Sequence, residues 1–357
     1  MTPALLVILL MACDSIDDHD TNRPVTETGD PSSQALYIPP LYAAVDHSLE
    51  LYFDTVLTAD GDPVEGAPAV VGDFEWRVTT DAHGTLDANR WTWTPTETTT
   101  IDLHLDQSLQ GGVVEQVSTT IEVVPAHSGD GLTIAVIGDS LTYMGFWVDD
   151  LAASLPGATF VGTLDETPMG WWTDGWSGAS AYSWTTNEDS PLVTDGRLDA
   201  ATYMNNLGAM PDVVIIMLGI NRVVTAEDHL WEDYVEQELE ATDAMMSALM
   251  THGVEVCIPV LTTPGHDDQA SWTDNYAGES WEDQFRWELR HRHQLRRQVE
   301  RWSGRENEGV FVAAAATAID PADGYPDDNA LHPQAGNPGY QQLAAPLHAA
   351  VSRSQWP

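Results

Sequence analysis

The second half of the chain alternates short apolar runs with helical segments, and this alternation restricts the fold more than any other feature. Helices are expected between the runs, most clearly over 226–252 and 282–302. The runs have the composition of parallel strands buried on both faces: Thr133 to Ile137, Ala158 to Val161, Val213 to Leu218, Val254 to Val260 and Val310 to Val312. The pattern predicts a doubly wound α/β sheet over residues 131–357, with sites at the carboxyl ends of its strands.

A different pattern occupies residues 35–126. Short β-rich runs recur there between turn clusters, without helical periodicity, at 49–53, 74–78, 91–93, 101–105 and 113–124. Such spacing predicts an all-β sandwich. The stretch from Phe74 to Val124 also resembles Ig-like modules of bacterial surface proteins, although the paired cysteines of antibody domains are absent. We therefore expect an Ig-like β-sandwich before the α/β domain.

The first thirteen residues are typical of an export signal. The apolar run from Ala4 to Ala12 is too short to span a bilayer and lies where a signal peptide has its hydrophobic region. It ends in Leu-Met-Ala-Cys13, which resembles a bacterial lipobox and implies that Cys13 is lipidated. A simple cleaved signal peptide is the alternative. Residues 14–34 are polar and predict a disordered tether. We expect an exported bacterial lipoprotein, anchored in a membrane at the periplasmic face or the cell surface.

The charge balance excludes one class of partner. There are 56 acidic residues and 13 basic ones, all of them Arg, so the formal net charge is −43. Nucleic acid is a poor partner for such a surface, because phosphate binding requires cationic side chains. The second cysteine, Cys257, lies in an apolar stretch and is expected to be buried. Two cysteines do not make a zinc site, and no metal or cofactor is predicted.

The first candidate for chemistry is Ser140. It belongs to Gly138-Asp139-Ser140, directly after the first apolar run and before a helix. A serine there lies near backbone N–H groups that can hold a developing oxyanion. The alternative is a serine that only caps the helix.

Three further motifs follow in the chain: Ser177-Gly178, Leu218-Gly-Ile-Asn221 and Leu331-His332-Pro333. Together with Gly138-Asp-Ser-Leu141 they resemble, in order and spacing, the four signature blocks of the SGNH (GDSL-like) hydrolase family. The resemblance covers about residues 131–357. It implies a flavodoxin-like three-layer α/β/α fold and ester hydrolysis through an acyl-serine intermediate.

The resemblance also implies a role for each matching residue. Ser140 would be the nucleophile and His332 its general base. The oxyanion donors would be the backbone N–H groups of Ser140 and Gly178 and the side-chain amide of Asn221. Gly175 competes with Gly178 for the second position.

The chain departs from the family pattern at two positions. The family usually has Asp three residues before the catalytic histidine, whereas Asn329 stands there and Asp328 precedes it. We favour Asp328 as the partner of His332, through a shift of the loop by one residue; Asn329 or a backbone carbonyl is the alternative. An amide orients the ring but cannot stabilise imidazolium by charge. Arg222 also stands where the family commonly has Asp.

Tryptophans and arginines are concentrated in two segments. Five tryptophans lie near the nucleophile and the second block, and either core packing or a platform for sugar faces explains them: Trp147, Trp171, Trp172, Trp176 and Trp184. Trp176 and Asp139 are the candidate substrate contacts. Seven arginines lie in one helical segment, either paired with the acidic body or forming a patch for acidic polysaccharide or lipid headgroups: Arg286, Arg290, Arg292, Arg296, Arg297, Arg301 and Arg305.

Three functional hypotheses remain open. The first is a surface serine esterase that removes acetyl or similar groups, with an acylated carbohydrate as the leading substrate. The second is a lipase or phospholipase on the same scaffold. The third is a non-catalytic surface binding protein with a decayed hydrolase site, for which Asn329 is the best support.

Overall fold

The computed structural model describes residues 33–36, 38–55, 57–60, 75–87, 89–109, 112–279, 281–335 and 338–357. The predicted signal segment, Cys13 and the tether up to residue 32 lie outside these ranges. Ser33 and Gln34, which the sequence assigns to the tether, belong instead to β1 (Ser33–Leu36), which pairs antiparallel with β4 (Leu57–Asp60).

A six-stranded sheet lies at the centre of the second domain. The central strand β10 (Thr133–Gly138) runs parallel to three others, β11 (Thr159–Val161), β13 (Trp172–Gly175) and β16 (Val213–Met217). β17 (Val256–Pro259) continues the parallel sheet beyond β16, and β12 (Asp165–Glu166) adds an antiparallel strand next to β13. The run 310–312, predicted as a fifth strand, makes only isolated parallel bridges from Val310 and Ala313 to the β17 region.

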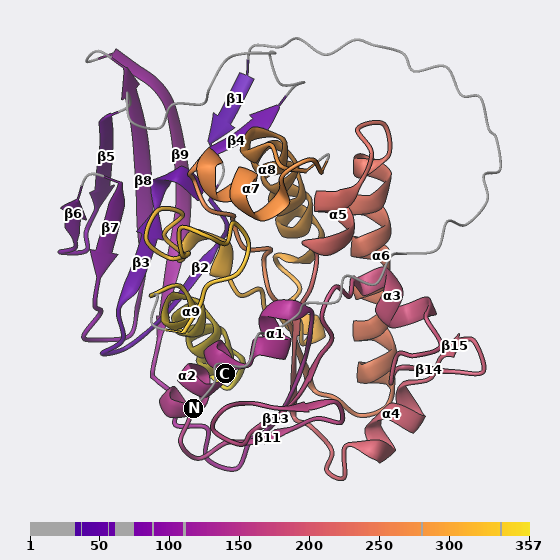
Figure 1. The fold of residues 1–357 in the computed structure, drawn as a ribbon. Coiled ribbons are helices and arrows are strands. Elements are labelled where there is room, and N and C mark those ends of the chain that lie inside the picture. The colour runs from indigo at the N-terminus through magenta and orange to yellow at the C-terminus, as the bar shows by residue number, and fades with distance from the viewer. Residues whose placement is uncertain are drawn as a thin grey trace, which may run out of the picture.

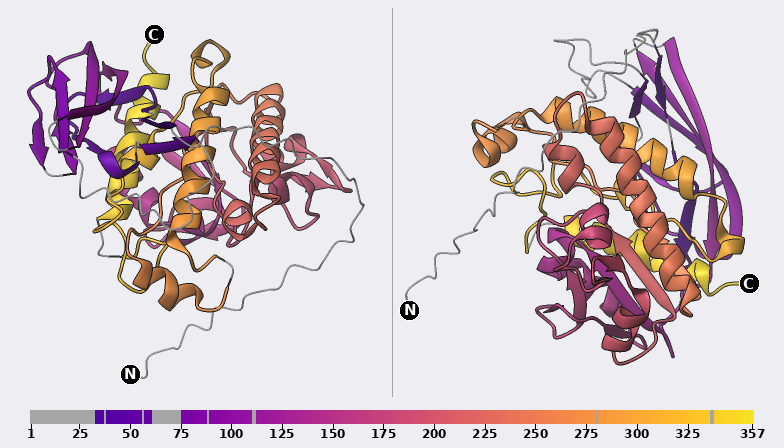
Figure 2. Two further views of the ribbon diagram at one scale, coloured as in Figure 1. Left: turned by 90° about the horizontal axis from the view of Figure 1, so that it is seen from above. Right: turned by 90° about the vertical axis from the view of Figure 1, so that its right-hand side faces the viewer.

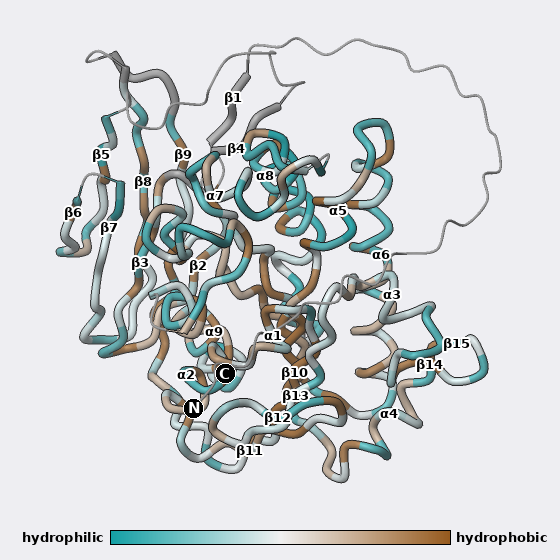
Figure 3. The backbone as a smooth tube through the Cα atoms, in the orientation of Figure 1, coloured by the Kyte–Doolittle hydropathy of each residue, from teal (hydrophilic) through white to brown (hydrophobic). Residues whose placement is uncertain are grey.

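The apolar runs of the sequence correspond to the buried strands of this sheet. Every residue of β16 is buried, and β10 is buried from Ile134 to Gly138. Figure 3 shows hydrophobic backbone gathered around β10. Both faces of the sheet are covered, with α2 (Phe146–Ser154) and α9 (Gly339–Ser354) on one side and α4 (Ala200–Asn206) and α6 (Trp231–Thr251) on the other (Figure 1). The domain is therefore a mixed α/β layered structure.

The remaining helices and short elements lie around this sheet. The helices are α1 (Ser140–Met144), α3 (Ala181–Thr186), α5 (Asn221–Thr225), α7 (Gln269–Tyr276) and α8 (Gln284–Trp302). Three 3-10 turns are η1 (Phe53–Thr55), η3 (Glu306–Glu308) and η4 (Ala315–Thr317). A small hairpin joins β14 (Val193–Thr194) to β15 (Arg197–Leu198).

The helix predicted over 226–252 begins later than expected. The structure has α5 ending at Thr225 and α6 starting at Trp231. Arg290 donates to the carbonyls of Val223 and Val224, and Arg286 donates to that of Ala226. These carbonyls are satisfied by side chains of another helix, so the chain can leave the helical conformation there.

Two further sheets form the all-β part of the chain. One has the order β2-β9-β8-β5 and the other β3-β7-β6. Their bounds are β2 (Leu41–Ala44), β3 (Leu49–Tyr52), β5 (Glu75–Thr80), β6 (Thr85–Asp87), β7 (Arg90–Trp93), β8 (Thr99–Leu109) and β9 (Gly112–Val124). Phe53 and Trp76 stack with ring centroids 5.0 Å apart. The structure thus has the predicted β-rich unit, while its Ig-like character stays a prediction.

The β-rich unit packs against the last helix of the α/β domain. Figure 2 shows the yellow helix α9 beside the indigo and purple strands. Tyr52 Oη accepts a hydrogen bond from Gln342 on α9 at 2.9 Å. Arg353, at the end of that helix, lies 2.7 Å from the Glu122 carboxylate on β9. These polar contacts orient the two units relative to each other.

Candidate active site

Ser140 stands at the carboxyl end of the central strand, where β10 passes into α1. Asp139 is the N-cap of this helix, and its side chain accepts a backbone N–H of the first turn at 3.0 Å. Gly138 permits the sharp passage, since a Cβ there would collide with the Thr142 side chain. The turn leaves Ser140 half-buried at the sheet edge where ligands bind in doubly wound folds.

His332 contacts the Ser140 hydroxyl directly. Its Nε2 lies 2.7 Å from Ser140 Oγ, across a sequence separation of 192 residues. Burial lowers the pKa of His332 to about 4, because desolvation disfavours the charged imidazolium. The ring is therefore neutral at neutral pH, and one of its nitrogens is able to accept a proton.

The other ring nitrogen faces Asn329. Asn329 Oδ1 lies 3.2 Å from His332 Nδ1, and the same oxygen accepts the backbone N–H of Leu331 at 3.1 Å and that of His332 at 2.9 Å. Asp328, which we favoured from the sequence, is exposed, and its Oδ1 lies 3.5 Å from Gln334 Nε2. The expected one-residue shift does not occur, because the Asn329 side chain closes a turn on the two following amides.

The orientation of the Asn329 amide defines the histidine tautomer. Only the oxygen of an amide can accept backbone N–H groups, so Oδ1 faces the ring. Nδ1 of His332 must then carry the hydrogen and donate it, which leaves the Nε2 lone pair toward Ser140. This is the tautomer that removes a proton from a serine hydroxyl. The amide orients the ring without adding negative charge.

The two candidate glycines, one at the end of β13 and one three residues beyond it, have different surroundings. Gly175 pairs with Gly138 in the sheet, and a Cβ on it would collide with the Tyr143 backbone. Gly178 has a left-handed φ of 77°, and a Cβ there would meet nothing within 4 Å. Gly175 is therefore required for close packing against α1, whereas Gly178 is exposed and a side chain there would meet no neighbour.

Asn221 lies at the start of α5, four residues beyond the end of β16. Its Nδ2 donates to the Ala179 carbonyl at 2.9 Å, which joins it to the residue after Gly178. A side-chain amide carries two N–H donors, so this bond leaves one for an incoming acceptor. Trp176 N donates to the carbonyl of Gly138 at 3.0 Å, which brings the same loop to the end of β10.

Asp139 has its carboxylate in the protein interior. It is 1% exposed, and burial raises its pKa to about 7. In this arrangement Asp139 caps α1 and does not offer its side chain to a ligand, in contrast to the substrate contact expected from the sequence.

The five tryptophans divide between the core and the surface. Trp147 and Trp184 are fully buried, and Trp184 Nε1 donates to the Gly138 carbonyl at 3.2 Å. Trp171 and Trp176 are half-buried, and Trp172 is 47% exposed. The Trp176 ring packs edge-on against Trp184 at 5.7 Å. Trp172 and Trp176 therefore keep surface that a ligand can reach, while Trp147 and Trp184 serve packing.

The arginine-rich segment forms ion pairs along its length. Arg290 is 1% exposed and lies 2.9 Å from Asp228. Arg301 and Arg305 both reach Asp243, at 2.6 and 3.0 Å. The other four also have carboxylate partners: Arg286, Arg292, Arg296 and Arg297. These contacts favour arginines that neutralise the acidic body over a patch for anionic ligands.

Glu238, which the sequence patterns do not single out, lies behind the loop that carries Gly178. It is on the buried face of α6, next to Leu239 and Thr242, and is 3% exposed. A carboxylate on the apolar stripe of a helix is rarely left without partners. The sequence signal for Glu238 is therefore an acidic residue on a helix face that is otherwise mostly apolar.

The described residues include neither a metal-binding cluster nor a membrane-spanning helix. No group of three or more His, Cys, Asp or Glu side chains in the described ranges is arranged to hold a metal ion. None of the helices there has the length and apolar character needed to cross a membrane.

Comparison with known proteins gives distant structural likenesses only. No protein-family model matches the chain, and no curated protein does. Among solved structures, the chain is similar to a candidate GDSL-like lipase from Parabacteroides merdae, with 17% identity, a TM-score of 0.37, and coverage of 62% of this chain and 97% of the other. A candidate arylesterase from Agrobacterium tumefaciens has 15% identity, a TM-score of 0.37 and coverage of 62% and 98%. An acetyl xylan esterase has 12% identity, a TM-score of 0.28 and coverage of 63% and 98%. Likenesses this distant assign no activity.

Proposed function

We propose that the protein is a serine esterase that hydrolyses carboxylic esters through an acyl-serine intermediate. The observation that carries the proposal is the 2.7 Å contact between Ser140 Oγ and His332 Nε2 at the carboxyl edge of the sheet. The Asn329 oxygen on the opposite side of the ring supports it, because it selects the tautomer that can accept the serine proton.

The reaction would proceed by acyl transfer in two stages. His332 Nε2 takes the proton of Ser140 while the serine Oγ attacks the ester carbonyl. The protonated ring then gives that proton to the leaving alcohol. A water molecule, deprotonated by the same nitrogen, then attacks the acyl-serine. The ring returns this proton to Ser140 Oγ as the bond to the acyl group breaks and the acid is released. The ring is neutral at neutral pH, so its Nε2 lone pair is free to accept the serine proton.

Three N–H groups are proposed to hold the oxyanion of each tetrahedral intermediate. They are the backbone N–H groups of Ser140 and Gly178 and the side-chain amide of Asn221. The open space at Gly178 and the remaining amide hydrogen of Asn221 support these roles. Such donors are effective because they are oriented before the charge develops.

For the substrate we propose an acetyl ester carried on carbohydrate. The accessible surfaces of Trp172 and Trp176 support it, since aromatic faces suit sugar rings. A lipase is the second candidate, because Tyr143 and Met144 on α1 are 51% and 38% exposed next to the nucleophile. A decayed, non-catalytic site is the least favoured, because the Ser140 and His332 side chains keep a bonded geometry.

We further propose that the protein is exported and membrane-anchored through a lipid on Cys13, and that the β-rich unit is an Ig-like domain. Nucleic acid is not proposed as a partner, given the net charge of −43. Mass spectrometry of the mature N-terminus tests the anchor: a diacylglyceryl group on Cys13 is expected, and an unmodified or differently cleaved N-terminus contradicts it.

Labelling by a fluorophosphonate probe and hydrolysis of p-nitrophenyl acetate test the esterase. We expect the wild type to react in both assays and Ser140→Ala to react in neither. A wild type that reacts no more than Ser140→Ala contradicts the proposal. A panel of acyl chain lengths and acetylated sugars then separates the carbohydrate esterase from the lipase.

A further inference from the structure

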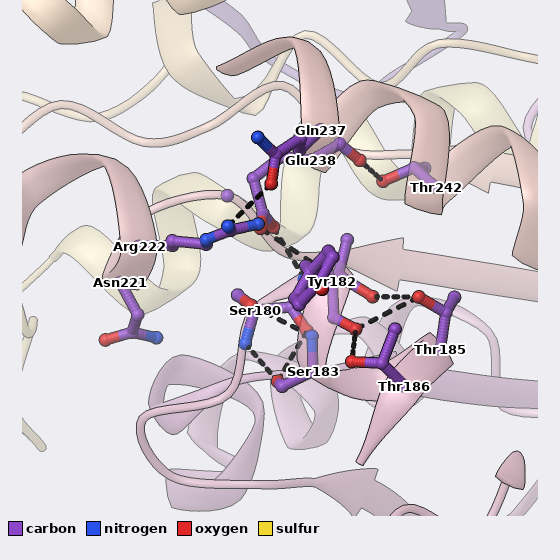
Figure 4. A network of polar contacts seen from close by, with 12 residues as sticks. Ser180, Tyr182, Ser183, Thr185, Thr186, Asn221, Arg222, Gln237, Glu238 and Thr242 are labelled. Atoms are coloured by element: carbon purple, nitrogen blue, oxygen red, sulfur yellow. Dashed lines mark hydrogen bonds and ion pairs between the residues drawn. The ribbon is translucent and has the colours of Figure 1, made fainter. Parts of the chain in front are cut away.

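The loop that carries Gly178 and the start of α5, where Asn221 lies, are joined by a network around the buried Glu238 and the half-buried Arg222 (Figure 4). The Glu238 carboxylate on α6 accepts the backbone N–H of Ala181 at 2.6 Å and that of Tyr182 at 3.4 Å. These amides follow Gly178 by three and four residues. Glu238 is therefore the acceptor that fixes the end of the loop after Gly178.

The second half of the network belongs to the residue next to Asn221. Arg222 Nη1 lies 3.8 Å from Glu238 Oε1, and Arg222 Nη2 donates to Gln237 Oε1 at 2.6 Å. The guanidinium is held between the rings of Tyr182 and Tyr234, at 4.1 Å from each centroid. Stacking and an ion pair together leave this arginine little freedom.

The network connects two segments that are far apart in the sequence. One arm reaches the loop after Gly178 through Glu238, and the other reaches Asn221 through its neighbour Arg222. The direct bond from Asn221 Nδ2 to Ala179 O spans the same two segments. Neither Glu238 nor Arg222 has a hydrogen bond or ion pair to Ser140 or His332, so the network acts on the donors and not on the proton transfer.

We propose that Arg222 and Glu238 are positioning residues that set the spacing between the Gly178 and Asn221 oxyanion donors. The inference rests on the proposed esterase function. Glu238 is 3% exposed, and burial raises the pKa of its carboxyl, whereas the Ala181 N–H, the Arg222 charge and the Tyr182 N–H act in the opposite direction. The negative charge of Glu238 therefore depends on these partners. Loss of Arg222 would weaken the hold of Glu238 on the loop, and the two donors would no longer converge on one oxygen.

The test compares kcat and KM for p-nitrophenyl acetate in Arg222→Gln, Arg222→Lys and Glu238→Gln. A displacement of catalytic groups by about 1 Å can cost on the order of 100-fold in rate. We therefore expect kcat to fall about 10- to 100-fold in Arg222→Gln and Glu238→Gln, with KM within about twofold, since the donors act mainly on the transition state. Arg222→Lys keeps the charge and should recover part of kcat.

Arg297→Gln is the matched control. Arg297 also pairs with a glutamate of α6, Glu236 at 2.7 Å, but it is 40% exposed and has no contact with either donor loop. We expect the kcat of Arg297→Gln to be unchanged. Its thermal stability should fall only slightly, because an exposed ion pair contributes little to stability.

A double-mutant cycle with Asn221→Ala separates positioning from general stability. Coupled residues have non-additive effects, so the loss caused by Arg222→Gln should be at least about threefold smaller once Asn221 is truncated. Equal losses in both backgrounds, a kcat within about twofold of wild type, or failure of all three network variants to fold would overturn the positioning role. A wild type without activity or labelling would instead contradict the esterase itself.

Discussion

Replacement of Asn329 by Asp tests whether the neutral amide limits the base. The carboxylate can accept the same two backbone N–H groups, so the turn should persist. It would place a negative charge where Oδ1 lies now, 3.2 Å from His332 Nδ1. At an effective dielectric constant of about 20, Coulomb's law gives an attraction of about 5 kcal/mol for full charges at that distance.

Solvent and the spread of charge over two oxygens reduce this figure. A carboxylate next to a cation typically shifts the pKa of its neighbour by about 1 to 3 units, which corresponds to about 1.4 to 4 kcal/mol. The pKa of His332 should therefore rise from about 4 into the range of about 5 to 7. Stabilised imidazolium should also raise kcat by about 10-fold or more above that pKa.

The pH profiles of kcat/KM for the wild type and for Asn329→Asp should cross. For the wild type, kcat/KM should fall on the acid side near the low pKa of His332, because the base must be neutral in the free enzyme. As the pH is lowered, Asn329→Asp should lose activity at a higher pH than the wild type does. At pH 8 it should be more active than the wild type. The assay is p-nitrophenyl acetate hydrolysis from pH 4 to 9, with Asp328→Asn as the control, expected within about twofold of wild type. An unchanged acid limit in folded Asn329→Asp, with no gain at pH 8, would refute the reasoning.

Three further predictions concern single residues around the nucleophile. Asn221→Ala should lower kcat about 100- to 1,000-fold with little change in KM, which is the usual loss for one oxyanion donor. Steady-state kinetics measure this, and a loss of kcat under tenfold contradicts the role of Asn221 as a donor. Gly175→Ala should lower the free energy of unfolding in urea by about 1 to 3 kcal/mol or more, because its Cβ collides with the Tyr143 backbone; an unchanged midpoint would show that α1 can move away. Burial raises the pKa of Asp139 from 3.8, its ordinary value, to about 7 in the folded protein, so the wild type should lose stability as the pH rises between these values. Asp139→Asn keeps an N-cap and should be a few kcal/mol more stable than the wild type at pH 8 but not at pH 4, which urea melts at both pH values would show.

The order of the parallel strands β10, β11, β16 and β17, and the sheet edge at which Ser140 and Asn221 lie, could be predicted from the sequence alone. Apolar runs that are buried on both faces have a composition that needs no tertiary information to recognise. Ser140 and Asn221 each follow such a run, and parallel strands bring their carboxyl ends to one edge. Local pattern and sheet geometry together therefore indicated a common site for residues 81 positions apart.

The helix boundary near residue 226 depended on tertiary contacts. The sequence predicts a helix from residue 226, but Arg286 and Arg290 of α8 bind the backbone carbonyls and the Asp228 carboxylate there, and α6 begins at Trp231. Such long-range side-chain partners compete with local capping, and no local pattern contains them. The division of the tryptophans between core and surface has the same origin.

The identity of the residue beside His332 was decided by tertiary structure as well. Asp328 has the charge that the chemistry favours, and it lies only one position from Asn329. The partner of His332 is the side chain that accepts the backbone N–H groups of Leu331 and His332 while the imidazole contacts Ser140. Those constraints come from opposite ends of the domain's sequence. The family resemblance implied the base, and only the folded chain determined the group that orients it.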